Sequence, residues 1–115
     1  MLTEVKSANG TILVPVETRL LNKRKVFLTG EIKQEMACEF VQSMMLLIEE
    51  NANAPIDVYI CSNGGSVAAG MLIVDTLQGI KDTEVNLHGF GAVKSMGAVI
   101  LACGKPQHRY INEKK

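Results

Sequence analysis

Apolar residues recur along the chain at two spacings, and segments of the two kinds alternate. Short apolar runs closed by glycine, asparagine or proline are typical of buried strands; they lie at 25–30, 56–61 and 84–90, with the start of a fourth at 108–111. Apolar residues three and four positions apart are typical of a buried helix face; they mark helices over 34–50, 66–80 and 95–103. The pattern therefore predicts strands and helices in alternation.

This alternation predicts the α/β class with a mostly parallel sheet. Helices between consecutive strands imply parallel strands joined by right-handed crossovers. In such sheets the ligand site lies at the carboxyl ends of the strands. Two glycine-rich loops, 62–65 and 89–94, follow strands at that edge. We therefore expect them to lie side by side and to form the functional site.

Composition removes several classes of function. The 115 residues make about one small domain, with 47% apolar residues and twelve basic residues against twelve acidic ones. No cationic field favours nucleic acid or a membrane surface, and no apolar run approaches the roughly 18 residues of a membrane span. The N-terminus lacks the pattern of a secretory signal. We expect a cytoplasmic protein without a cofactor.

The three cysteines, Cys38, Cys61 and Cys103, are odd in number and lack CxxC spacing. This spacing supports neither a zinc site nor a disulfide framework. Each cysteine lies in an apolar run, so we expect reduced thiols in the core. No metal site is expected.

The second loop admits a nucleotide-binding interpretation, which the sequence disfavours. Gly89 and Gly91 open the pattern G-x-G-x-x-G, but Lys94 stands at the third glycine position, where glycine allows close helix–strand packing. The motif also belongs near the first strand, with an acidic residue about 20 positions later on a second strand, whereas the only acidic residue beyond this loop is Glu113, in the charged tail. No Walker-type G-K-[ST] motif is present.

The alternative is a nucleophilic serine at the start of a helix. The oxyanion of a tetrahedral adduct on Ser95 Oγ would lie close to the N–H of Met96, which is unpaired because it is among the first N–H groups of a helix. Gly65, in the neighbouring loop, offers a second N–H with no side chain in the way, and two such donors constitute an oxyanion hole. The residues alone leave another role open, in which Ser66 and Ser95 are both helix N-caps.

A resemblance favours the nucleophile. The segments are VFLTG at 26–30, SNGGSV at 62–67, GM at 70–71, DT at 75–76 and KSMGA at 94–98. In this order and spacing they resemble the proteolytic subunit of Clp protease, a family of serine peptidases with the ClpP/crotonase fold, a spiral of ββα units. The similarity covers about residues 19–112. The pairing of SNGGSV with SMGA about 30 residues later is specific to that family.

The resemblance implies roles for particular residues. Ser95 matches the nucleophile, and Gly65 and Met96 match the N–H donors of the oxyanion hole. The segment 64–67, comprising Gly64, Gly65, Ser66 and Val67, matches the stretch that pairs with an extended substrate. Residues 1–18 match the N-terminal segment that lines an axial pore, and 19–115 match the ClpP-like domain. The resemblance also implies a homo-oligomer, a heptameric ring, that receives unfolded polypeptides from an AAA+ unfoldase.

Two positions depart from the family pattern. Asn63 stands where the family usually has proline, and asparagine also suits a tight turn. Lys94 stands where the residue before the nucleophile is usually small. A cation there would either tune the reactivity of Ser95 or extend into solvent.

The proton-transfer half of the peptidase site is missing from these residues. A serine nucleophile needs a base and a group that orients the base. The family supplies His and Asp from segments beyond the helix of the nucleophile, and the chain ends at Lys115, in the charged segment NEKK. We therefore expect a C-terminally incomplete form that is inactive alone, and a downstream strand followed by His and then Asp would settle this.

No residue of the chain replaces that base. His88 shares a strand face with Asn86 and Phe90, which favours a structural or surface role, and His108 opens the last strand, distant from Ser95 in register. Lys94 is adjacent to Ser95, and neighbouring residues at a helix start do not aim their side chains at each other. Two alternatives stay open, a non-catalytic ClpP-like ring component and an acyl-CoA enzyme of the crotonase superfold.

Overall fold

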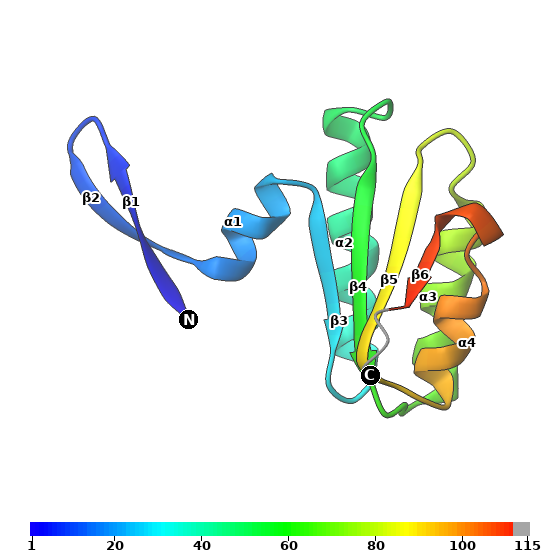
Figure 1. Ribbon diagram of the computed structural model, residues 1–115. Coiled ribbons are helices and arrows are strands. Elements are labelled where there is room, and N and C mark those ends of the chain that lie inside the picture. The colour runs from blue at the N-terminus through cyan, green and yellow to red at the C-terminus, as the bar shows by residue number, and fades with distance from the viewer. Residues whose placement is uncertain (112–115) are drawn as a thin grey trace.

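The computed structural model describes residues 1–111 and has two parts, an N-terminal arm and an α/β domain (Figure 1). The arm comprises β1 (Leu2–Ser7), β2 (Gly10–Pro15) and α1 (Val16–Asn22). The domain comprises β3 (Lys25–Thr29), α2 (Gln34–Glu50), β4 (Ile56–Ser62), α3 (Val67–Gly79), β5 (Val85–Val93), α4 (Met96–Ala102), a 3₁₀ turn (Pro106–His108) and β6 (Arg109–Ile111).

The domain is built on a parallel sheet with the strand order β3-β4-β5-β6. Each strand therefore lies beside the next one in the sequence, and the helices make the crossovers between them. The predicted α/β class and parallel sheet are confirmed. The predicted strands and helices of the domain agree with the observed ones except at the end of β5, which is described with the site below.

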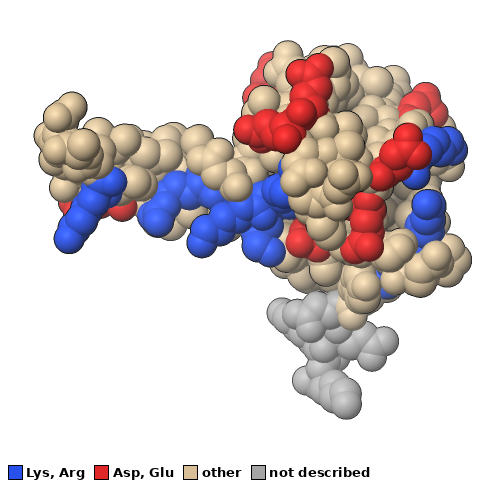
Figure 2. Space-filling model, turned by 90° about the horizontal axis from the view of Figure 1, so that it is seen from above, with Lys and Arg blue, Asp and Glu red and all other residues tan. Residues whose placement is uncertain are grey.

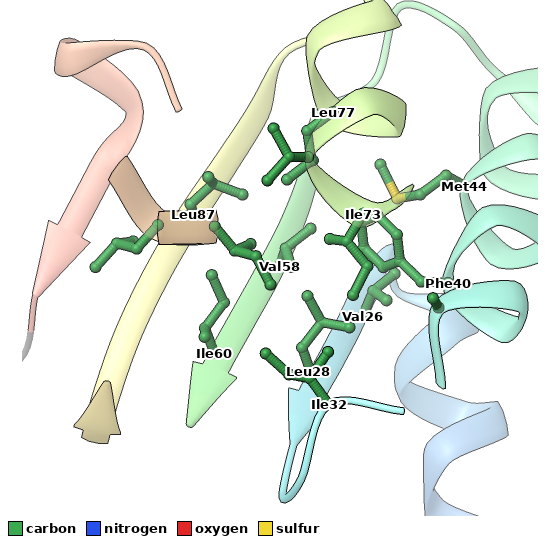
Figure 3. Close-up of a cluster of buried hydrophobic side chains, with 14 of the residues drawn as sticks. Val26, Leu28, Ile32, Phe40, Met44, Val58, Ile60, Ile73, Leu77 and Leu87 are labelled. Carbon is green, nitrogen blue, oxygen red and sulfur yellow. The ribbon is translucent and has the colours of Figure 1, made fainter. Parts of the chain in front are cut away.

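The helices α2, α3 and α4 pack against one face of the sheet and form a single core (Figures 1 and 3). Along β4 the side chains of Ile56, Val58 and Ile60 are fully buried, while Asp57 and Tyr59 between them are half-buried. This alternation places every second residue of a strand on the helix side. The helices contribute Phe40 and Met44 of α2, Ile73 and Leu77 of α3, and Ile100 of α4.

The opposite face of the sheet carries a column of stacked rings, one from each strand. Phe27, Tyr59, His88 and Tyr110 are cross-strand neighbours. Their ring centroids lie 4.9, 4.7 and 5.0 Å apart in that order, with nearly parallel planes. Within residues 1–111 no helix covers this face, and Phe27 and Tyr110 are 40% and 47% exposed.

Arg24 ties the start of the sheet to the end of α2. Its guanidinium donates hydrogen bonds to four carbonyl oxygens, those of Leu47, Asn51, Ala54 and Pro55, at 2.8–3.1 Å. The backbone of Arg24 has φ = 63°, a left-handed conformation that costs free energy in a residue other than glycine. The fork of donors on arginine suits this set of converging acceptors, which a lysine would satisfy less completely.

The N-terminal arm projects from the domain, and the sequence pattern did not predict its hairpin. The strands β1 and β2 pair antiparallel from Leu2↔Pro15 to Ser7↔Gly10. The radius of gyration is 14.8 Å, against about 13 Å expected for a compact chain of this length. Basic side chains follow one side of the arm (Figure 2). The division at residue 18, and the axial role of residues 1–18, stay predictions.

Candidate active site

The two glycine-rich segments converge at the carboxyl ends of β4 and β5, as predicted. Ser62 pairs with Val93, and the N–H of Lys94 donates to the carbonyl of Ser62 at 3.0 Å. Beyond this pair, Gly64 lies directly against Ser95. A Cβ on Gly64 would fall 2.8 Å from the Cβ of Ser95 and 3.1 Å from its Oγ. The loop after β4 therefore forms one wall beside the serine.

The segment 89–94 is not a free loop, which corrects the boundary expected from the sequence. β5 continues to Val93 and contains both Gly89 and Gly91. β5 advances four positions, from Gly89 to Val93, where β4 advances two, from Ile60 to Ser62, so the ladder contains a bulge. Gly91 has φ = 62° in this bulge, and a Cβ there would lie 3.0 Å from the Cys61 Sγ. These glycines thus serve the bulge and its close packing.

Ser62 organises the turn at the end of β4 and was not singled out from the sequence. Its side chain is 3% exposed, and its Oγ accepts a hydrogen bond from the N–H of Gly64 at 3.0 Å. Serine side chains often bond the backbone two residues later in turns, so the Ser-Asn-Gly spacing was the available signal. The bond fixes Gly64, whose φ is 112°, in its position against Ser95.

Ile32 holds the same loop from the other side. The N–H of Ile32 donates to the carbonyl of Gly64 at 3.0 Å, and the N–H of Ser66 donates to the carbonyl of Ile32 at 2.9 Å. In this parallel bridge between Ile32 and Gly65 the N–H and C=O of Gly65 point away from Ile32. Within residues 1–111 neither group of Gly65 makes a backbone hydrogen bond, so both are open to an added strand.

The two serines at the helix starts behave differently. Ser66 is the N-cap of α3, and its Oγ accepts a hydrogen bond from the N–H of Ala69 at 3.1 Å, so the capping interpretation is confirmed for it. Ser95 occupies the N-cap position of α4 with φ = 53° and ψ = −124°, and its side chain makes no capping bond. Ser95 is exposed and sits in a strained turn from strand to helix.

Met96 anchors this turn to α3. Its side chain is buried at 6% exposure and fills a notch at Gly70, where a Cβ would collide with the Met96 side chain. The N–H of Met96 lies on the Gly64 side, since the same Cβ on Gly64 would fall 3.4 Å from the Met96 nitrogen. Among the described residues no backbone acceptor takes this N–H. The side chain is thus held while the amide stays available.

Neither histidine lies beside Ser95. His88 stands in the middle of β5 on the stacked face, and its Nε2 is 2.9 Å from the Oδ1 of Asp57. His108 precedes β6 at the opposite end of the sheet, with its Nδ1 2.9 Å from the Oδ1 of Asn86. The expected structural role of His88 agrees with these contacts. Ser95 therefore has no imidazole partner in the part of the chain that the structure describes.

The cysteines are free, as expected, but they are not all in the core. Cys38 is exposed on the outer face of α2, which the apolar run around it did not indicate. Cys61 and Cys103 are half-buried, and burial raises the pKa of the Cys103 thiol. Between residues 1 and 111 no three His, Cys, Asp or Glu side chains lie close enough to hold a metal ion. No helix in this range is long and apolar enough to cross a bilayer.

A one-sided parallel sheet with helices on its covered face is consistent with the ClpP/crotonase-like fold that the motifs implied. The family model "Clp protease" matches residues 8–114. The chain therefore belongs to the Clp protease family. This membership makes it a ClpP-like protease chain.

Proposed function

We propose that this chain is a Clp-type serine endopeptidase subunit that cleaves unfolded polypeptides, with Ser95 as its nucleophile. The observation that carries the proposal is the backbone of Ser95, held at φ = 53° in an uncapped, exposed turn. Strain of this kind costs about 1–3 kcal/mol and collects at functional sites. A sharp strand-to-helix turn is also how other hydrolases present a nucleophilic serine.

The backbone around Ser95 offers the donors for the reaction. Ser95 Oγ would attack the peptide carbonyl carbon and give its proton to a base, and the carbonyl oxygen would become an oxyanion. The N–H of Met96 and the N–H of Gly65 would stabilise that charge. Collapse would release the amine with a proton and leave an acyl-serine for water to hydrolyse. Gly64, Gly65, Ser66 and Val67 would pair with the substrate, using the open C=O of Gly65.

Within residues 1–111 no histidine is placed to act as the base. His88 is engaged with Asp57 and His108 with Asn86, both away from Ser95. In serine proteases, loss of one triad member leaves roughly 10³–10⁴-fold catalysis over water, far below useful turnover. We therefore expect residues 1–115 to hydrolyse peptides hardly at all by themselves. The same observation favours a second candidate, a non-catalytic ring component.

The exposed apolar side chains on the helices support the proposal that the chain self-associates. Met45 and Leu46 of α2, Met71 of α3 and Val99 of α4 are 42–60% exposed. Apolar residues gathered on helix surfaces favour burial against other subunits. We propose a homo-oligomer, a heptamer on the family resemblance, that works in the cytoplasm with an AAA+ unfoldase, because a closed chamber admits only unfolded chains.

The test of the nucleophile compares two proteins on a fluorogenic peptide. One is residues 1–115, and the other carries after residue 115 the His- and Asp-bearing segments of the family. Hydrolysis by the second protein, abolished by Ser95→Ala, supports the peptidase. Failure of the extended and correctly folded protein favours the non-catalytic component. Hydrolysis by residues 1–115 that Ser95→Ala abolishes would show that a base is already present.

The test of assembly is light scattering after size-exclusion chromatography. We expect a mass well above that of the 12.5 kDa chain. Replacing Met45 and Leu46 together with Gln should lower that mass, since both are exposed and contribute nothing to the core. A monodisperse monomer at high concentration would contradict the ring.

A further inference from the structure

Lys94 brings a charge to the site that the nucleophile chemistry does not use. It precedes Ser95 directly, and it is exposed. Its backbone is fixed on both sides, because its N–H donates to the carbonyl of Ser62 at 3.0 Å and its C=O accepts from the N–H of Gly97 at 2.9 Å. The side chain therefore starts from a fixed point beside the serine.

The side chain of Lys94 leaves the sheet on the side away from the core. Val93, its neighbour, packs against the core cluster, and successive residues at the end of a strand project to opposite sides. Adjacent Cα atoms lie about 3.8 Å apart, and the flexible four-carbon stem of lysine lets the ammonium move around that point. The ammonium can consequently approach a group bonded to Ser95 Oγ.

Nothing in the described residues neutralises this charge. Lys94 forms no ion pair within residues 1–111. The first turns of α3 and α4, which flank the site, contain no acidic residue. The nearest charges on the third wall, Glu31 and Lys33 on either side of Ile32, are opposite in sign. Within residues 1–111, Lys94 is therefore a cation next to Ser95 that no ion pair offsets.

We propose that Lys94 is a specificity-determining residue, which favours substrates with a negative charge beside the bond that Ser95 attacks, such as an Asp or Glu side chain. This inference rests on the proposed function of Ser95 as the nucleophile. The attraction acts on the charged substrate alone, so it changes the ratio between charged and neutral substrates. Any effect of Lys94 on the reactivity of the serine itself cancels in that ratio.

The expected size is modest because the site is open to water. Unit charges roughly 8 Å apart near a surface attract enough for a preference of about two- to fivefold, and salt screens most of it above about 0.5 M. A preference of this size is measurable when the compared substrates have the same shape.

The experiment measures acylation of Ser95 by aryl esters that differ only in charge. The probes are the 4-nitrophenyl esters of benzoic acid and of terephthalic acid, the second with a free para carboxylate that cannot reach its own ester. Nitrophenolate leaves without protonation, so acylation of Ser95 is measurable over hours at pH 8 without a resident base. Peptide mapping by mass spectrometry separates acyl-Ser95 from acyl-lysine. The unsubstituted chain is compared with Lys94→Gln, Lys94→Glu and Lys94→Arg. The control is Lys81→Gln, because Lys81 is an exposed lysine in the segment before β5, at the opposite end of the sheet from Ser95.

The outcomes distinguish the proposed role of Lys94 from the proposed role of Ser95 as the nucleophile. We expect the carboxylate-to-benzoate ratio to fall about threefold in Lys94→Gln, to fall further in Lys94→Glu, and to persist in Lys94→Arg and Lys81→Gln. High salt should bring the ratio of the unsubstituted chain to that of Lys94→Gln. An unchanged ratio in Lys94→Gln and Lys94→Glu, with Ser95 still acylated, overturns the role of Lys94 alone. Reaction at Ser95 no faster than at Ser43 or Ser7 overturns the nucleophile and this inference together.

Discussion

Ser66 and Ser95 follow adjacent parallel strands, stand at the starts of successive helices, and have opposite conformations. Ser66 has φ = −64°, and its hydroxyl oxygen accepts a hydrogen bond from the N–H of Ala69. Ser95 has φ = 53° and leaves its hydroxyl exposed and uncapped. In this chain the serine with negative φ caps its helix, and the serine with positive φ leaves its hydroxyl free.

The backbone around Ser95 explains why the strained turn persists. The N–H of Lys94 is bonded to Ser62, the N–H of Gly97 to Lys94, and the N–H of Ala98 to Ser95. Gly64 closes the remaining side, with no room for a side chain. Strained conformations survive where the surroundings determine them in this way. Ser66 needs no such enclosure, because its conformation is an ordinary extended one.

The largest expected contrast is in covalent labelling by a fluorophosphonate. We expect slow labelling at Ser95, complete loss in Ser95→Ala, and unchanged labelling in Ser66→Ala, because the Ser66 hydroxyl is engaged as a cap. Intact-mass spectrometry measures the adduct. Loss of labelling in Ser66→Ala with the fold intact would mean that the two serines act together.

The next contrast concerns the wall between the two serines. Gly64→Ala should destabilise the protein by about 1–3 kcal/mol and displace Ser95, since φ is 112° and the new Cβ would lie 2.8 Å from the Ser95 Cβ. Urea unfolding measures the stability, and fluorophosphonate labelling reports the serine. Gly79→Ala is the control, because nothing lies within 4 Å of its Cβ. Equal behaviour of the two variants would contradict the close approach of the loops.

A smaller effect is expected from the cap itself. Ser66→Ala should lower the free energy of unfolding by about 1 kcal/mol, because the N–H of Ala69 loses its acceptor. Ser66→Asp, which also caps helices, should retain most of that stability. A loss of the same size in Ser66→Asp would show that the hydroxyl serves something other than capping. Thermal or urea unfolding of the three proteins suffices.

The smallest effect has the opposite sign. Ser95→Gly should raise the free energy of unfolding by about 0.5–1 kcal/mol relative to Ser95→Ala, because glycine accepts positive φ while alanine keeps the strain. Both variants lose the hydroxyl, so the difference isolates the backbone. If Ser95→Gly is no more stable than Ser95→Ala, Ser95 is not strained.

The sequence predicted most of the domain because its strands and helices are buried on one side. Ile56, Val58 and Ile60 alternate with polar or half-buried residues, and the α2 residues on the core follow the helical spacing. The hairpin was missed because it has no buried side to produce a pattern; Ile12 and Leu13 are 51% and 62% exposed. The dipeptide Asn9-Gly10, where the turn ends and β2 begins, was its one signal.

The site was predicted in its location and only partly in its geometry. Parallel strands end at one edge, so the convergence of Gly64 and Ser95 followed from topology. The bulge at Gly91 could not be predicted from topology, because it depends on the local register between β4 and β5. The contact of Ile32 with the loop at Gly65 could not be predicted either, because it joins segments more than 30 residues apart. The residues alone left Ser95 between cap and nucleophile, because the identity of a residue does not determine its φ, and only the family resemblance favoured the nucleophile.

The column of stacked aromatic side chains on the open face of the sheet makes that face optically distinct. The chain has two tyrosines and no tryptophan, and both tyrosines, Tyr59 and Tyr110, lie in the column on either side of His88. Tyrosine emission from the folded protein therefore originates on one surface. Any event that separates the rings or covers them changes the signal, while movements confined to the core or the arm leave it unchanged. The molecule carries an intrinsic fluorescent reporter for a single face, with no label attached.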